Sequence, residues 1–176
     1  MKILLKSATI VDVSSKHHLK KRDVLIENGK ISKIASTISP TEKIKEVSLK
    51  NLHISQGWFD SSVSLGEPGF EDRETIANGL LVAAKSGFSA IALQPNSFPV
   101  IDNQSQVNFV LNKSLGFATQ LYPIGTLTKE AAGHDMAELF DMTKAGAIAF
   151  GDYNKSIANA NLLKIALQYV QDFDSL

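Results

Sequence analysis

The sequence contains no cysteine. Disulfide bonds and cysteine-ligated zinc sites are therefore excluded, and the chain is compatible with a reducing compartment. It also lacks any run approaching the roughly 18 apolar residues that a membrane span requires. Near the amino terminus, Lys2 and Lys6 interrupt the apolar residues too early for a signal peptide. These absences predict a cytoplasmic protein that has no membrane partner.

Net charge is also absent, because 18 acidic residues balance 18 basic ones. A dedicated nucleic-acid-binding protein normally carries a basic surface. The one basic cluster, residues 16–22, is short and is typical of a solvated loop. We therefore expect no nucleic-acid partner. Apolar residues make up 44% of the 176 residues, which is typical of a packed globular protein.

Several common motifs are missing as well. The sequence has no P-loop, no Gly-x-Gly-x-x-Gly and no Gly-x-Ser-x-Gly. Its four histidines, His17, His18, His53 and His134, have no second histidine or carboxylate at ligand spacing in a strand-end context. They are expected to be structural or solvated, and they do not predict a metal site.

Residues 1–55 have the pattern of a small β domain. Two short apolar runs, residues 23–27 and 30–34, flank Asn28-Gly29. Asn-Gly is a strong hairpin signal because a type I′ turn needs positive φ at both central residues. Further β runs are expected over residues 2–13 and 45–54. Hairpins without intervening helices predict a small antiparallel, β-sandwich-like domain.

Residues 56–176 alternate between strand and helix patterns. Helix–glycine–strand junctions occur at Gly87, Gly116 and Gly146, at intervals of 29 and 30 residues. Such spacing is typical of successive βα units. Strands are expected at residues 57–65, 88–93, 117–123 and 147–150, and helices at about 73–86, after a cap at Asp102 or Asn103, from about 135, and after a cap at Ser156. This pattern predicts an α/β fold with four βα units, the first half of a (β/α)8 TIM-type barrel.

The first of these strands organises the rest. Its alternation places Asp60, Ser62 and Ser64 on one side. In parallel α/β barrels the chemistry sits where strands end. Ser62 and Ser64 therefore stand at the position of an active site.

The stretch resembles the first barrel strand of the cyclic amidohydrolases, and above all that of the dihydroorotases. The family pattern is Pro-Gly-Phe-x-Asp-x-His-x-His-Leu-Arg-Glu-Pro-Gly, followed one strand later by Met-Pro-Asn-Thr. The residues kept are Gly57, Asp60, Leu65, Glu67, Pro68, Gly69, Pro95 and Asn96. The family residues that this chain lacks are the two histidines, replaced by Ser62 and Ser64, the arginine, replaced by Gly66, and the first proline, replaced by Gln56.

The resemblance implies what these replacements remove. In the active family the two histidines hold zinc, which activates a water that opens or closes the ring amide of dihydroorotate. Serine hydroxyls are poor ligands in that place. The family arginine and the asparagine of the Pro-Asn motif hold the substrate carboxylate, so Gly66 loses a bidentate clamp. Asn96 is then either a vestigial substrate contact or an ordinary turn residue.

A third segment, residues 145–154, resembles the family sequence Ala-Gly-Ala-Val-Ala-Phe-Ser-Asp-Asp-Gly. In one branch of the family the first aspartate of that pair is a metal ligand, and it aligns with Asp152. Tyr153 and Asn154 replace the Asp-Gly that follows. Asp152 is therefore either a residual metal ligand or a hydrogen-bonded loop carboxylate.

The resemblance is to the amino-terminal half of a dihydroorotase, so the chain is expected to be part of a longer protein. The alternative is a complete open α/β domain. We interpret it as a non-catalytic dihydroorotase-like protein of pyrimidine biosynthesis, with no cofactor expected in this chain. In this family, inactive chains serve as structural partners of aspartate carbamoyltransferase. The resemblance therefore implies that this chain is a scaffold for that transferase, or that it self-associates. The alternatives are an active metal-dependent cyclic amidohydrolase with an altered metal site, or a likeness of fold alone.

Overall fold

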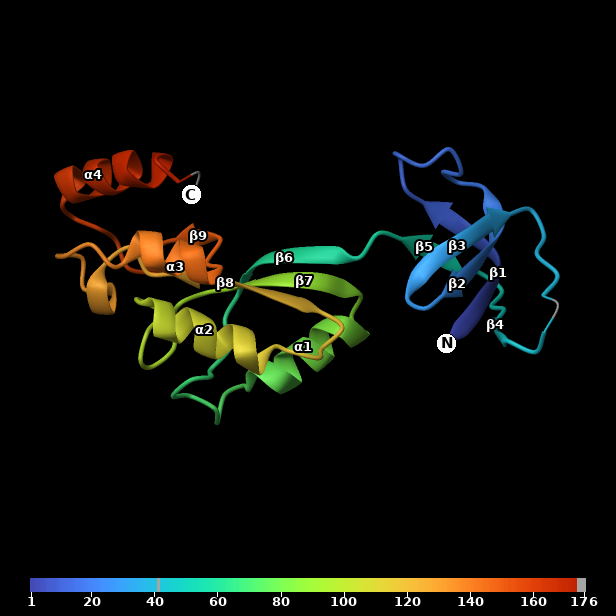
Figure 1. Cartoon of the computed structure of the whole chain (residues 1–176), viewed down its shortest axis with the longest axis horizontal. Helices are drawn as coiled ribbons and strands as arrows, with labels where there is room; N and C mark the ends of the chain where they lie inside the picture. The colour runs from blue at the N-terminus through green and yellow to red at the C-terminus, as the bar shows by residue number, and fades with distance from the viewer. Residues whose placement is uncertain (41, 174–176) are drawn as a thin grey trace. The chain divides into compact units, whose positions relative to one another are not determined.

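The computed structural model describes residues 1–40 and 42–173 (Figure 1). The chain divides into two compact units, Met1–Gln56 and Gly57–Leu176, and each contains its own sheet. Among the residues that the structure describes, none of the helices is long and apolar enough to cross a membrane.

The sheet of the first unit is built around β1. Its strands are β1 (Lys2–Val11), β2 (Lys21–Glu27), β3 (Lys30–Ala35), β4 (Lys45–Val47) and β5 (His53–Ser55), in the order β3-β2-β1-β4, with β5 also on β1. The β1–β2 and β2–β3 pairs are antiparallel, as predicted. Asn28 and Gly29 have φ values of 50° and 78°, which confirms the expected hairpin turn. β4 and β5 add to β1 in parallel, and the single run expected over residues 45–54 is two strands.

A buried carboxylate ties this unit together. The Asp23 carboxylate accepts hydrogen bonds from the Ser7 amide at 2.8 Å, the Ile38 amide at 2.9 Å and the Lys6 ammonium at 2.6 Å. Ser7 has a φ of 51° and lies where the β1–β2 register shifts. Burial opposes ionisation of Asp23, but the ammonium and the two amides outweigh it and hold the pKa of this carboxyl below its ordinary value.

The second unit contains four parallel strands in the order β6-β7-β8-β9. The strands are β6 (Trp58–Val63), β7 (Phe88–Leu93), β8 (Gln120–Gly125) and β9 (Ala149–Phe150); the helices are α1 (Ile76–Lys85), α2 (Gln104–Lys113), η1 (Lys129–Ala131), α3 (Leu139–Ala145) and α4 (Ala160–Gln171). Each strand is followed by a helix. The prediction of a half-barrel is therefore confirmed.

Local signals explain most of these boundaries. The Thr75 hydroxyl accepts from the Asn78 amide to cap α1, and Asn103 caps α2 as expected. Gly146 ends α3 with a φ of 115°. Two expectations are wrong. Asn159, rather than Ser156, caps α4 through bonds from the amides of residues 161 and 162. α3 begins later than residue 135, because Met136 instead forms a bridge to Thr128.

The core of this unit lies between the sheet and its helices. Ile91, Leu93 and Leu121 point from the strands into a buried cluster with Leu80 of α1 and Val107 of α2. Figure 1 shows α1 and α2 running along β7 and β8. Packing the helices in this way leaves the carboxyl ends of the four strands together at one edge, where the loops carry the polar residues.

Candidate functional site

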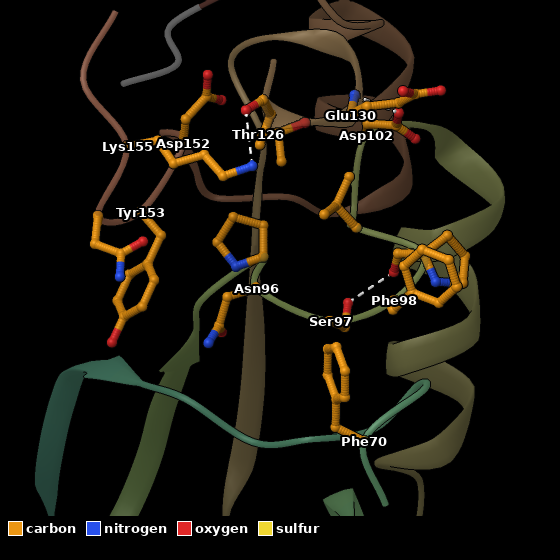
Figure 2. Close-up of a pocket in the computed structure, with 15 residues that line it drawn as sticks. Phe70, Asn96, Ser97, Phe98, Asp102, Thr126, Glu130, Asp152, Tyr153 and Lys155 are labelled. Carbon is orange, nitrogen blue, oxygen red and sulfur yellow. Dashed lines mark hydrogen bonds between the residues drawn. The ribbon is translucent and has the colours of Figure 1, made fainter. Parts of the chain in front are cut away.

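A cavity of about 750 Å³ lies at the carboxyl ends of the parallel strands. Loops after all four strands line it: Phe70 follows β6, residues 95–100 follow β7, Thr126 and Glu130 follow β8, and residues 152–155 follow β9. Figure 2 shows these side chains around the cavity, with Phe70 and Phe98 on one side and Asp152 and Lys155 on another. Active sites of parallel α/β barrels lie at this end of the strands.

Two serines, Ser62 on β6 and Ser64 just after it, are hydrogen-bonded to the segment that follows β7. The Gln94 side-chain amide donates to the Ser62 hydroxyl at 3.2 Å, and the Asn96 amide donates to the Ser64 hydroxyl at 2.6 Å. The two pairs are spaced two residues apart on both segments, so they form two successive links between the end of β6 and the segment after β7. Sequence reasoning missed Gln94, although its two-residue spacing from Asn96 matches that of the serines.

The opening strand is less regular than its sequence suggests. The β6–β7 register shifts between Asp60 and Val63. Asp60 accepts a hydrogen bond from the Ser62 amide at 3.0 Å. Asp60 and Ser64 also line a second, smaller cavity of about 360 Å³ beside α1. The simple alternation expected for Asp60, Ser62 and Ser64 is therefore interrupted at the register shift.

The turn after β6 explains why part of the family motif is retained. Glu67 is buried; its Oε2 accepts from the Ile76 amide at the start of α1 (2.9 Å) and its Oε1 pairs with the Lys113 ammonium at 2.9 Å. The hydrogen bond to Glu67 raises the pKa of Lys113. Glu67 thus joins the turn to α1 and α2, which is a structural task.

Gly66 has a structural role too. A Cβ built at Gly66 would lie 1.9 Å from the carbonyl oxygen of Phe70, which a real side chain cannot do. At Gly69, which has a φ of 93°, a Cβ would lie 2.1 Å from the carbonyl oxygen of Phe98. The turn is closed so tightly that this backbone has no room for an arginine at position 66.

Asp152 is buried and accepts three hydrogen bonds. Its Oδ1 accepts from the amides of Leu127 and Thr128 at 2.9 and 3.0 Å, and its Oδ2 accepts from the Thr128 hydroxyl. These bonds hold the segment after β8 against the segment after β9. Both carboxylate oxygens already have donors, although Asp152 also lines the cavity.

The side chains present do not fit a zinc ion in this arrangement. Zinc in proteins prefers imidazole, thiolate and carboxylate donors. Here residues 62 and 64 offer two hydroxyls that already accept amide hydrogens, and the carboxylate of Asp152 already accepts three hydrogen bonds. Within residues 1–40 and 42–173, no group of three or more histidine, cysteine, aspartate or glutamate side chains is placed to hold a metal.

Two buried polar atoms that line the cavity have no hydrogen-bond partner. They are the Asn96 Oδ1 and the Thr126 Oγ1. Asn96 was a predicted site residue, whereas Thr126 was not found from sequence because a lone threonine after a strand carries no signal. The charged residues that line the cavity are Asp102, Glu130, Asp152 and Lys155, and the Lys155 ammonium donates to the Ala131 carbonyl at 3.1 Å.

Comparison with known proteins identifies the relatives of this chain. A dihydroorotase from Pelotomaculum thermopropionicum is 39% identical over 170 residues, covering 96% of this chain and 39% of the relative. A dihydroorotase from Syntrophus aciditrophicus is 36% identical over 178 residues, covering 100% and 42%. The chain therefore spans about two fifths of the length of these curated relatives.

Solved structures show the same fold. The crystal structure of a dihydroorotase superposes with a TM-score of 0.69 at 13% identity, covering 99% of this chain and 49% of that one. An L-hydantoinase (dihydropyrimidinase) from Arthrobacter aurescens gives 0.68 at 18% identity, covering 84% and 32%. A family model described as dihydro-orotase-like matches residues 53–176. The chain belongs to the dihydroorotase-like family.

Proposed function

We propose that this chain is a non-catalytic member of its family, a pseudoenzyme with a structural role in pyrimidine biosynthesis. The observation that supports the proposal is the position and hydrogen bonding of the Ser62 and Ser64 hydroxyls. Their hydroxyls stand where the family pattern has imidazoles, and both accept hydrogen bonds from neighbouring amides. A serine hydroxyl stays neutral at pH 7 and replaces neither imidazole as a metal donor.

The neighbouring groups support the same proposal. The position of the family arginine is Gly66, where the closed turn excludes a side chain. Asp152, the remaining candidate ligand, is bonded to three donors of the β8 segment. Restoring both histidines would therefore leave Gly66 without a side chain and Asp152 engaged by its three hydrogen bonds, and we expect Ser62→His with Ser64→His to remain inactive.

Metal content and hydrolysis test this proposal together. The purified protein is analysed for zinc by mass spectrometry, and dihydroorotate turnover is followed by absorbance, beside an active dihydroorotase. We expect well under one zinc per chain and no turnover above buffer. Stoichiometric zinc with chelator-sensitive turnover would overturn the proposal.

For the partner, we propose aspartate carbamoyltransferase. The support is the family resemblance together with the exposed edge of the sheet: Trp58 and Phe59 on β6 are 66% and 54% exposed. An edge strand with exposed apolar side chains is prone to pair with another chain. Mixing the two proteins and measuring mass by light scattering tests this, with Trp58→Lys expected to weaken the complex.

Leu115→Lys is the matched control, since Leu115 is 73% exposed and lies after α2 rather than on β6. It should leave the complex intact. A mass equal to two copies of this chain, with or without the transferase, would instead favour self-association. A cytoplasmic location stays a prediction, resting on the lack of cysteine.

The second candidate is a cyclic amidohydrolase with an altered metal site. It is favoured by one observation, that Asp152 lines the cavity at the strand ends. A zinc-dependent hydrolysis of a cyclic amide that Asp152→Asn abolishes, without unfolding the protein, would establish it.

A further inference from the structure

We propose that the first unit binds a compact anion of several charges, a di- or triphosphate group, in a recess between the loop of residues 12–20 and β3. The recess has a volume of about 420 Å³, which is within the usual range of small-molecule sites. It shares no residue with the cavity at the strand ends. The proposal therefore goes beyond the proposed function and does not depend on catalysis in the second unit.

Two segments that are distant in the sequence meet at this recess. The loop between β1 and β2 contributes Lys16 and His17, and β3 contributes Lys33. Among the described residues that line the recess, none is acidic. The basic cluster of residues 16–22 is thus extended by a lysine from another strand, which sequence reasoning did not bring to it.

The two lysines at the recess have no counter-charge. Both Lys16 and Lys33 are exposed. The ion pairs found within residues 1–40 and 42–173 involve Lys2, Lys6 and Lys113 instead. An anion in the recess would therefore gain two ammonium partners without breaking an existing ion pair, which favours its binding.

The His17 imidazole lies in the same positive field. Its partial burial and the positive charges of Lys16, Arg22 and Lys20 hold its pKa below the ordinary value. The Lys20 ammonium and the Arg22 guanidinium donate to the backbone carbonyls of Lys16 at 3.1 Å and Lys21 at 2.8 Å. These bonds leave the two positive charges unneutralised, so they add to the attraction for an anion.

The one acidic residue of the loop is engaged elsewhere. The Asp12 carboxylate accepts from the Ser14 amide at 3.0 Å and from the Gln56 side-chain amide at 3.3 Å. Asp12 does not line the recess. It therefore does not occupy the place that the proposal gives to a ligand anion.

The donors around the recess suit phosphate oxygens. A lysine ammonium carries three donors and binds phosphate as a point charge. The Ser15 hydroxyl, which also lines the recess, accepts from the His17 amide at 3.2 Å and keeps its own hydrogen to donate. A di- or triphosphate carries several charges in a short chain, so one molecule can reach ammonium groups from both segments, whereas a single carboxylate offers one charge.

The shape of the site favours a small anion over a lipid surface. The exposed apolar side chains of the loop, those of Val13 and Leu19, are the groups that would enter a membrane. Neither of them lines the recess. The cations therefore converge on a concave site that the apolar side chains do not share.

Binding of inorganic triphosphate tests the proposal. The purified chain is titrated by calorimetry at about 0.15 M ionic strength, where charges more than about 8 Å apart are largely screened. We expect saturable binding that Lys16→Gln with Lys33→Gln weakens at least about tenfold. The control is Lys43→Gln with Lys50→Gln, which removes the same charge at exposed lysines of the first unit outside the recess. It should weaken binding less than about twofold.

The His17 ring gives a second readout, which a general loss of positive charge would not reproduce. A bound anion opposes the repulsion from the neighbouring cations, so triphosphate should raise the pKa of His17. By linkage, binding should tighten as pH falls through this pKa. Ring C–H resonances followed by NMR across pH measure the change. The resonances of His53, which does not line the recess, should not respond to triphosphate.

Adenosine triphosphate distinguishes two sources of the same phosphate chemistry. Ile31 and Ile34 also line the recess and could contact a nucleotide ring. Tighter binding than that of inorganic triphosphate would support the proposal with a nucleotide as the ligand. Equal binding would support it with the phosphate chain alone as the recognised group.

The contrary outcomes are as clear. Absence of triphosphate binding, equal weakening by the two pairs of lysine variants, or an unchanged His17 pKa would each overturn the inference. Vesicles of equimolar phosphatidylglycerol and phosphatidylcholine, and a single-stranded DNA oligonucleotide, are tested beside triphosphate. If either bound while triphosphate did not, the partner would be a lipid surface or a nucleic acid and the inference would be wrong.

Discussion

Two threonines that lie two residues apart after β8 have opposite environments. Both are fully buried. Thr128 donates its hydroxyl to Asp152 and accepts from the Gly133 amide at 2.9 Å, whereas the Thr126 hydroxyl has no partner. The first belongs to the framework that holds the loops, and the second faces the cavity. The comparison separates polar groups that stabilise the fold from polar groups that are available to a ligand.

The same division runs through the family motif. Glu67 and Asp152 accept hydrogen bonds from neighbouring segments and have structural roles. The turn at Gly66 can close because glycine has no side chain. Asn96 is bonded on one side only. Retained motif residues therefore divide into those that the turn needs and those that still face the cavity.

The largest effect is expected when the carboxylate that Thr128 contacts is removed. Asp152→Ala removes three hydrogen bonds and leaves the buried amides of Leu127 and Thr128 without acceptors, so we expect a loss of about 3–5 kcal/mol in the free energy of unfolding. Urea denaturation measures the loss, and amide exchange at Leu127 and Thr128 locates it. Asp72→Ala, at an exposed loop carboxylate, should change stability by less than about 0.5 kcal/mol.

The closed turn offers the next largest effect. Gly66→Ala places a Cβ against the Phe70 carbonyl, and we expect about 1–3 kcal/mol of destabilisation in thermal or urea unfolding. Gly151→Ala is the control, because nothing lies within 4 Å of a Cβ there. If both variants were equally stable, the turn would be free to open and the excluded arginine would lose its explanation.

Asp23 extends the comparison to the first unit and makes it depend on pH. Its carboxyl pKa is lowered, so its stabilising effect is full above the unfolded value near 3.9 and is lost as pH falls through the folded value. Asp23→Asn should therefore cost about 1–3 kcal/mol at pH 7, and this gap should close below about pH 4. Melting temperatures between pH 7 and pH 2.5 measure it; a gap that stays constant would contradict the ion pair.

The smallest effect is expected at the hydrogen bonds that link Ser62 and Ser64 to the segment after β7. Ser64→Ala removes the 2.6 Å bond from Asn96 at an exposed position, and the loss should be about 0.5–1 kcal/mol in urea unfolding. Ser61→Ala, an exposed serine on the same strand, should have no measurable effect. A larger loss for Ser61 would show that strand propensity, rather than the link, stabilises this strand end.

Much of the fold was predictable because its signals are local. The Asn28-Gly29 hairpin, the glycine junctions and the cap at Asn103 each depend on the conformation of one or two residues. The cap of α4 and the start of α3 were misplaced, because Ser156 and Asp135 carry the right chemistry but tertiary contacts such as the Met136 bridge position the chain differently.

The sequence by itself determined the half-barrel pattern, the family and the replacement of two imidazoles by hydroxyls. Only the tertiary structure decided that Gln94 pairs with Ser62, that Glu67 reaches Lys113 and that Thr126 differs from Thr128. The physical reason is that periodicity and turn chemistry act between neighbours in the chain, whereas a hydrogen bond or a close backbone approach depends on distances between segments that only the packed fold brings together.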